Sequence, residues 1–173
     1  VVRLPGIGSR IGIHIAAPGL AIEHGSPLDG VARARLSTVY MPGNKITMLP
    51  DAVVQNYTLA GGVDCPAVSL YLTVNDVFEV ISHESRLEMV HIAANLRHHE
   101  VEPWFNAETI NGPLPDEPFR DELVHLWHFA NACEGRRGKP SATQGINDYN
   151  FAINGDLADP DACTVEISER KRG

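Results

Sequence analysis

The sequence predicts a mixed α/β (α+β) fold, in which a mixed sheet is flanked by helices. Segments with strand-type alternation, such as residues 68–74, recur along the chain. Between them lie segments with helical spacing of apolar residues, of which residues 118–133 are the clearest. The two kinds of segment do not alternate strictly, which favours a mixed arrangement over a regular strand–helix–strand repeat. With 173 residues, 43% of them hydrophobic, the chain can form one domain with its own core.

Two hairpins are predicted in the first half of the chain. Residues 1–15 have strand character at both ends and are interrupted by breakers such as Gly6, which favour a turn. Residues 68–74 alternate and are rich in β-branched side chains. Asn75-Asp76 then predicts a turn, and residues 77–86 the returning strand.

Short elements are predicted between these hairpins. A helix is expected to begin at Pro27, since proline is favoured in a first helical turn, and to continue to Arg35. Residues 37–41 are β-prone and end at a turn over residues 42–44. A second short helix is predicted over residues 51–59.

The rest of the chain predicts a connector, a long helix and a strand pair. Residues 98–118 are rich in Pro, Asn and Glu, which is typical of a connector. The helix over residues 118–133 is indicated by apolar residues at helical spacing: Phe119, Leu123, Leu126, Trp127 and Ala130. It is expected to end near Gly135, and residues 148–153 and 164–167 are expected to pair as strands.

The domain prediction combines these segments into one partial domain, residues 1–173. It comprises a strand-rich core with short helices, a connector, and a helix plus strand pair, over residues 1–97, 98–118 and 119–173. The chain starts at Val1 without an initiator Met and ends in a basic run. We therefore expect a fragment of a longer protein.

Charge and composition exclude several classes of protein. The net charge is −8 and the pI is about 5.4, so the chain lacks the overall basic surface of a free-standing nucleic-acid binder. A nucleic-acid role would need a local groove. No apolar run approaches the ~18 residues of a membrane span, so no membrane partner is expected. The three cysteines, Cys65, Cys133 and Cys163, form no CxxC pair, which favours a reducing, cytoplasmic location.

Two histidines offer one catalytic hypothesis. His125 and His128 are three residues apart on the long predicted helix, with Glu122 one turn earlier. Such a spacing can present both imidazoles on one helical face. A small metal-dependent hydrolase is therefore one alternative, although a catalytic zinc needs three protein ligands and no HExxH motif occurs. Nucleophile-elbow and phosphate-loop motifs are absent as well.

The most informative motifs lie within residues 13–50. They occur in the following order: Ile13-His14-Ile15-Ala16-Ala17-Pro18, Gly25-Ser26-Pro27-Leu28-Asp29, Ser37-Thr38-Val39-Tyr40-Met41-Pro42-Gly43 and Met48-Leu49-Pro50. In this order they resemble the RNB catalytic domain of the ribonuclease II family. Glu84-Ser85-Arg86 and Asp148-Tyr149-Asn150-Phe151 extend the resemblance more weakly. The resemblance implies an RNB-type fold and a 3′-to-5′ exoribonuclease that uses magnesium to hydrolyse single-stranded RNA to nucleoside monophosphates.

The resemblance also predicts what this chain lacks. The family's magnesium-binding aspartates would lie upstream of Val1, and a further catalytic stretch downstream of Gly173. We therefore expect no catalytic residue, no metal ligand and no cofactor within the chain, and an inactive fragment. Ala17 stands where the family has aspartate. This departure favours another alternative, a non-catalytic RNA-binding or assembly module derived from an RNB domain.

Three residues are predicted to bind single-stranded RNA. Tyr40 and His91 match positions where the family clamps RNA with aromatic side chains, and an aromatic face can stack on any base. Arg35, five residues before Tyr40, could reach a phosphate if the chain turns back. We further expect a homodimer, formed through apolar surface that truncation would expose.

Overall fold

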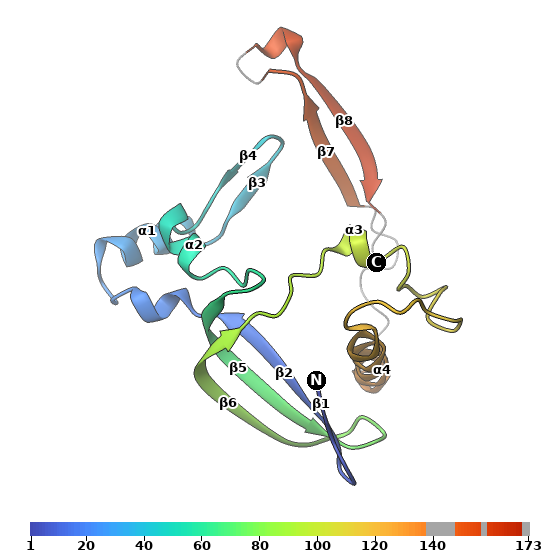
Figure 1. Ribbon diagram of the computed structural model, residues 1–173. Helices are drawn as coiled ribbons and strands as arrows, with labels where there is room; N and C mark the ends of the chain where they lie inside the picture. The colour runs from blue at the N-terminus through green and yellow to red at the C-terminus, as the bar shows by residue number, and fades with distance from the viewer. Residues whose placement is uncertain (138–147, 157–158, 171–173) are drawn as a thin grey trace. The chain divides into compact units, whose positions relative to one another are not determined.

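The computed structural model of the protein describes residues 1–137, 148–156 and 159–170. These residues fall into two compact units that interleave along the sequence (Figure 1). The first unit holds residues 1–17 and 58–137, and the second holds residues 18–57, 148–156 and 159–170. The mixture of sheets and helices confirms the predicted fold class. The single-domain organisation stays a prediction.

The first unit is built on an antiparallel sheet of four strands. They lie in the order β1 (Val2–Leu4), β2 (Gly8–Ala16), β5 (Asp64–Val74) and β6 (Val80–His91). The pairing of β1 with β2 confirms the hairpin predicted for the N-terminal residues. Gly8 enters β2 with a φ of 134°, and a Cβ at this position would overlap the carbonyl oxygen of Val74. Glycine therefore allows the close approach of β2 to β5.

The hairpin of β5 and β6 differs from its predicted position. Strand β5 begins earlier than expected, and β6 begins later and continues to His91. The prediction of a return strand over residues 77–86 is wrong at its start, because the turn is longer than two residues. The Asn75 side chain accepts hydrogen bonds from the backbone N–H groups of Val77 and Glu79, at 3.1 and 2.8 Å. These bonds hold the segment in a turn and delay the start of the strand.

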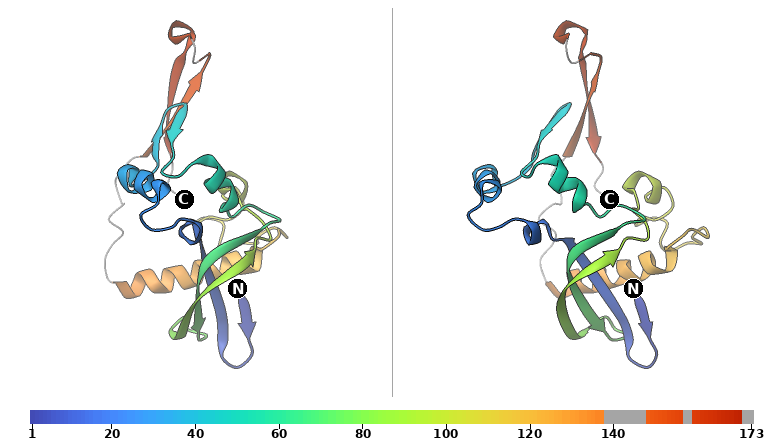
Figure 2. Two further views of the ribbon diagram at one scale, coloured as in Figure 1. Left: turned by 90° about the vertical axis from the view of Figure 1, so that its left-hand side faces the viewer. Right: turned by 60° about the vertical axis from the view of Figure 1, so that its left-hand side comes forward.

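Helix α4 (Arg120–Arg137) runs across the strands of the sheet in both views of Figure 2. The long predicted helix is thus confirmed, and its end at Arg137 lies two residues from Gly135, near which it was expected to end. Its last turn is held by Arg136, which donates hydrogen bonds to the carbonyl oxygens of Val77 and Phe78 at 2.9 and 2.5 Å. In the described part of the chain, no helix is long and apolar enough to cross a membrane.

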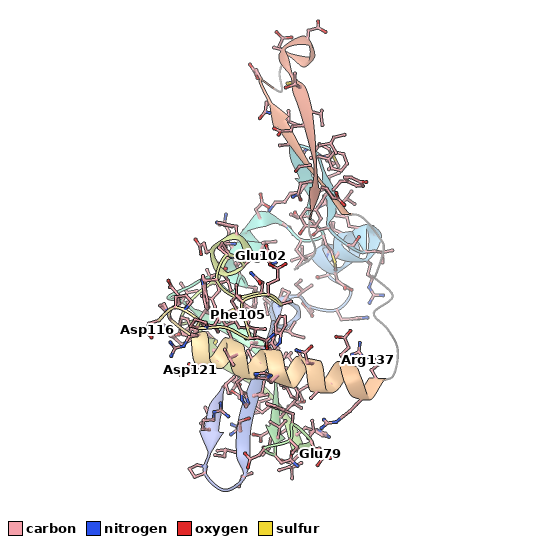
Figure 3. All side chains as sticks on the ribbon, turned by 90° about the vertical axis from the view of Figure 1, so that its right-hand side faces the viewer. Glu79, Glu102, Phe105, Asp116, Asp121 and Arg137 are labelled. Carbon is pink, nitrogen blue, oxygen red and sulfur yellow. The ribbon has the colours of Figure 1, made fainter. Side chains whose placement is uncertain are left out.

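The predicted connector contains more structure than its composition indicates. It includes the short helix α3 (His98–Val101), which was not predicted. Phe105 follows it and meets the ring of Trp127 on α4 edge-on, with 5.7 Å between the ring centroids (Figure 3). The ring of Trp104 also packs against that of Phe105, with 5.8 Å between the ring centroids. Aromatic packing therefore ties the connector to α4.

The buried centre of the first unit includes two serines as well as apolar side chains. Ile11 and Val74 are among the largest fully buried side chains, and Ser9 and Ser69 are 1% and 0% exposed. A buried hydroxyl group is costly unless it has a hydrogen-bond partner. Each serine accordingly pairs with a histidine, as described below.

The second unit consists of short elements. In chain order they are a 3₁₀ turn (Pro18–Ala21), α1 (Pro27–Arg35), β3 (Val39–Met41), β4 (Asn44–Ile46), α2 (Asp51–Asn56), β7 (Asp148–Asn154), a second 3₁₀ turn (Pro160–Ala162) and β8 (Thr164–Arg170). The helix beginning at Pro27 and the C-terminal strand pair are confirmed. Strand β4 was not predicted, because three residues are too few to show alternation. Helix α2 is shorter than the predicted helix over residues 51–59.

Candidate nucleic-acid interface

Helix α1 begins with a fully formed cap. The hydroxyl of Ser26 accepts a hydrogen bond from the backbone N–H of Asp29 at 3.2 Å. The Asp29 carboxylate accepts the N–H of Gly25 at 2.9 Å and the Nε–H of Arg33 at 3.0 Å. The Gly25 hydrogen bond is the main reason that the pKa of Asp29 lies below its usual value, and Arg33 adds to the effect. These contacts fix the start of α1 and, through the length of the helix, the position of its last residue, Arg35.

Arg35 lies where α1 meets the ribbon formed by β3 and β4. Its Nη1 group donates a hydrogen bond to the carbonyl oxygen of Thr47 at 2.7 Å. The backbone N–H of Met48 donates to the hydroxyl of Thr38 at 3.2 Å. The two bonds close the base of the ribbon. The expected turning back of the chain after Arg35 is thus present, with the guanidinium beside the ribbon.

Tyr40 projects from the middle of this ribbon. It lies in the middle of β3, and its side chain is 79% exposed. The tight turn between β3 and β4 includes Gly43, whose φ of 71° suits glycine. An exposed ring on a short ribbon can present its face to a base without rearrangement of a core.

His91, the third predicted RNA-binding residue, belongs to the first unit. It ends β6, and its Nδ1 lies 2.7 Å from Oδ1 of Asp64, the residue paired with it across the strands. Both side chains are more than half exposed, at 65% and 63%. The predicted residues are thus divided, with Tyr40 and Arg35 in the second unit. Their roles in RNA binding stay predictions.

The sheet of the first unit carries a polar cluster that the sequence analysis missed. The guanidinium of Arg10 lies over the ring of Tyr71, 4.2 Å from its centroid, and that of Arg86 lies at 5.5 Å. Glu84 pairs with both arginines, and its hydrogen bond to Arg86 is the main cause of its lowered pKa. The hydroxyl of Tyr71 donates to Glu88 at 2.7 Å, which raises the pKa of the tyrosine.

In this Tyr71 cluster, which comprises Arg10, Tyr71, Glu84, Arg86 and Glu88, the two carboxylates balance the charges of the two arginines. Alternation of polar residues along β2, β5 and β6 was a signal that could have indicated it, because every second residue shares a face. His14 belongs to the same face: its Nδ1 lies 2.7 Å from the hydroxyl of Ser69, and its ring meets Tyr71 edge-on. Since both arginines already face Glu84, the cluster is better suited to holding three strands in register than to binding an anion.

The histidines of α4 do not form the metal site that was considered as an alternative. His125 is 6% exposed, and its Nε2 lies 2.6 Å from the hydroxyl of Ser9. His128 stacks on Phe78, with 6.4 Å between ring centroids and 25° between the planes. No group of three His, Cys, Asp or Glu side chains that could hold a metal occurs among the described residues. The hypothesis of a hydrolase using His125, His128 and Glu122 is therefore wrong for this geometry.

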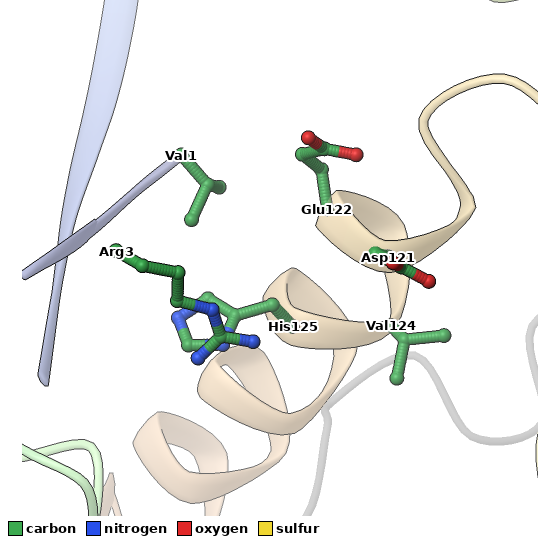
Figure 4. Close-up of a pocket in the computed structure, with 6 residues that line it drawn as sticks. All are labelled: Val1, Arg3, Asp121, Glu122, Val124 and His125. Carbon is green, nitrogen blue, oxygen red and sulfur yellow. The ribbon is translucent and has the colours of Figure 1, made fainter.

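A cavity of about 370 Å³ lies beside His125 (Figure 4). Arg3 of β1 and Glu122 of α4 line it together with His125. Burial is the main cause of the lowered pKa of His125, and the positive charge of Arg3 contributes to it. The imidazole is therefore neutral at pH 7 and can share a hydrogen bond with Ser9 in either tautomer.

The lowered pKa of His125 predicts a loss of stability in acid. Below an unfolded-state pKa of about 6.5, the unfolded chain binds a proton that the folded chain resists, so the free energy of unfolding decreases as pH falls. Above that pH the neutral, buried His125 makes its full contribution to the free energy of unfolding. Urea unfolding across pH 5 to 8 is expected to show this decrease in the wild type and a weaker one in His125→Gln. Equal pH profiles of the two proteins would contradict the assignment to His125.

The described residues also do not fit the magnesium ion that the family resemblance implies. Magnesium prefers carboxylate oxygens and water in octahedral geometry. Acidic side chains of the first unit, such as Glu84, Glu88 and Asp64, are bound to arginine, tyrosine or histidine partners. No converging set of acidic ligands occurs in the ranges 1–137, 148–156 and 159–170.

Comparison with known proteins gives a consistent result for the whole sequence. The sequence model of the RNB domain matches residues 1–173. Ribonuclease R of Thermotoga maritima is 24% identical over 174 residues, which cover 100% of this chain and 24% of that protein. The chain thus spans about a quarter of that relative's length.

Two solved structures share the fold over most of the chain. The structure of Mycoplasma genitalium RNase R in complex with double-stranded RNA has a TM-score of 0.74 at 15% identity, over 98% of this chain and 29% of that one. The structure of yeast Ssd1, a pseudonuclease, has a TM-score of 0.66 at 25% identity, over 82% of this chain and 17% of that one. The first of these supports the fold alone, and the second is a structure described as that of a pseudonuclease.

Proposed function

Because this chain belongs to the RNB domain family, as its resemblance to ribonuclease II implied, we propose that the protein containing it is a 3′-to-5′ exoribonuclease. It hydrolyses single-stranded RNA to nucleoside monophosphates. The relatives named ribonuclease R and exoribonuclease 2 support the class of enzyme. The role of this chain is to bind and guide the RNA.

The observation that carries the proposal is the exposed ring of Tyr40 on the ribbon of β3 and β4. Stacking on such a ring does not depend on base identity, which suits an enzyme that degrades RNA of any sequence. Arg35 lies at the base of the same ribbon, with one N–H group used by Thr47. Since guanidinium has five N–H donors, the others can contact a phosphate. His91 is proposed as a further contact, with its ring oriented by Asp64.

Magnesium dependence and a cytoplasmic location are proposals for the whole protein, and a homodimer formed through apolar surface that truncation exposes is a proposal for this chain. The described residues contribute RNA contacts to it. They supply no step of phosphodiester hydrolysis, so we propose that this chain alone is inactive.

A second candidate function is a non-catalytic RNA-binding module. It is favoured by the 25% identity to the pseudonuclease Ssd1, which is higher than the identity to the RNase R structure. Ala17, in the position where the family has aspartate, points in the same direction. Both candidates share the RNA contacts and differ only in whether hydrolysis follows binding.

Degradation of labelled RNA by the whole protein tests the two functions. We expect 5′-labelled single-stranded RNA to shorten progressively from its 3′ end with magnesium, and to stay intact when the metal is chelated. The 173-residue chain, assayed beside it, should leave the RNA intact. Binding without shortening would favour the non-catalytic module. An absence of binding would overturn both, and degradation by the chain alone would contradict its proposed inactivity.

A further inference from the structure

The ribbon of β3 and β4 places a lysine directly opposite Tyr40. Lys45 and Tyr40 are paired residues of the two antiparallel strands, so their side chains project from the same face. The neighbouring pair, Val39 and Ile46, projects from the opposite face. One face of the ribbon therefore combines an exposed aromatic ring with an ammonium group.

The charge around this lysine differs from that of the whole chain. Between Gly30 and Pro50 the sequence contains Arg33, Arg35 and Lys45 and no acidic residue, although the net charge of the chain is −8. Asp29, just before this segment, is paired with Arg33 at 3.0 Å. The segment is thus a local positive region on an acidic protein, which favours contact with a polyanion.

Lys45 differs from the two arginines in that its charged group is not engaged by another described residue. Arg33 is engaged by Asp29 and His24, and Arg35 by the carbonyl oxygen of Thr47. The side chain of Lys45 is exposed and forms no ion pair with any residue that the structure describes. Because its ammonium group is carried on a long, flexible side chain, a lysine can reach a phosphate over a range of positions.

From this arrangement we infer that Lys45 contacts a backbone phosphate of the RNA whose base stacks on Tyr40. The inference rests on the proposed RNA-binding function and adds a residue to it. Stacking holds the base and the lysine holds the backbone beside it, and neither contact reads sequence. The ribbon then binds one nucleotide unit through two independent interactions, one apolar and one electrostatic.

The salt dependence of RNA binding separates these two interactions. Neutralising one phosphate of a single strand contributes about 0.7 to the slope of the logarithm of affinity against the logarithm of salt concentration. We expect Lys45→Ala to reduce this slope by about 0.7 and to weaken binding several-fold at low salt. Lys45→Arg should retain the wild-type slope. The measurement uses the whole protein, fluorescently labelled single-stranded RNA and a chelator that prevents degradation.

Arg33→Ala is the matched control, because it removes a cation of the same segment that is already paired with Asp29. It should leave the slope unchanged. If the wild type binds RNA and Lys45→Ala has the wild-type slope, the inference about Lys45 is wrong and the proposed function stands. If the wild type does not bind RNA at any salt concentration, the proposed function itself fails and the inference falls with it.

Discussion

Replacing Tyr40 by alanine is expected to weaken the binding of single-stranded RNA to the whole protein by about 5- to 150-fold. Stacking of one base on an aromatic side chain contributes about 1–3 kcal/mol, and 1.4 kcal/mol corresponds to a factor of ten in affinity. Tyr40 is 79% exposed, so its removal leaves no cavity, and the free energy of unfolding should change little. Fluorescence anisotropy with labelled RNA, in the presence of a chelator, measures the effect.

Two variants make this result specific. Tyr40→Phe retains the ring and loses only the hydroxyl, so it should bind within about twofold of the wild type. Tyr149→Ala removes another exposed tyrosine, which is 49% exposed on β7 and has no predicted role. It should leave affinity unchanged. Wild-type affinity in Tyr40→Ala, or equal losses in both alanine variants, would remove the observation on which the proposed function rests.

The second large effect is expected at His125, where alanine should lower the free energy of unfolding by about 3 kcal/mol. Its ring is 6% exposed and lies 5.1 Å from the ring of Phe78, measured between centroids. The substitution opens a cavity beside the ring of Phe78 and leaves the buried hydroxyl of Ser9 without its histidine partner. An unpaired buried polar group alone costs about 1–3 kcal/mol. Urea unfolding at neutral pH measures the change.

The more exposed of the two histidines of α3, His99, provides the control for this experiment. His99→Ala removes a side chain that is 80% exposed and should change the free energy of unfolding by less than about 0.5 kcal/mol. The double variant Ser9→Ala/His125→Ala should be more stable than the sum of the single changes implies, because it removes both partners of the hydrogen bond. Strict additivity would show that Ser9 and His125 do not interact.

Local signals explain which elements the sequence could predict. Helix α1 begins as expected because its capping residue, Ser26, and its first-turn proline, Pro27, are adjacent in the sequence. The hairpins of β1–β2 and β7–β8 are marked by turn residues between alternating segments. The β5–β6 turn was placed wrongly, since the extra hydrogen bonds of the Asn75 side chain are not visible in alternation.

The candidate site was predicted in part for the same reason. Tyr40 and Arg35 were selected through motifs of an RNB domain, and the match of that domain over residues 1–173 confirms the family. The sequence did not indicate the hydrogen-bond partners of two predicted site residues. Arg35 donates to the carbonyl oxygen of Thr47, and the ring of His91 pairs with the carboxylate of Asp64. The hypothesis of a metal site on α4 was wrong because helical spacing shows only that two histidines lie close together on the helix. It does not show whether further ligands lie near them or which residues their rings contact instead.

The sequence by itself determined the family, the fold class and the places where α1, α2 and the hairpins of β1–β2 and β7–β8 begin, because these depend on residues close together in the chain. Only the tertiary structure decided that His125 binds Ser9, 116 residues away, and that Arg10 and Arg86 share the ring of Tyr71. Such contacts follow from strand register and from how α4 packs on the sheet. No short-range pattern encodes either, since both are set by burial and hydrogen bonding between distant segments.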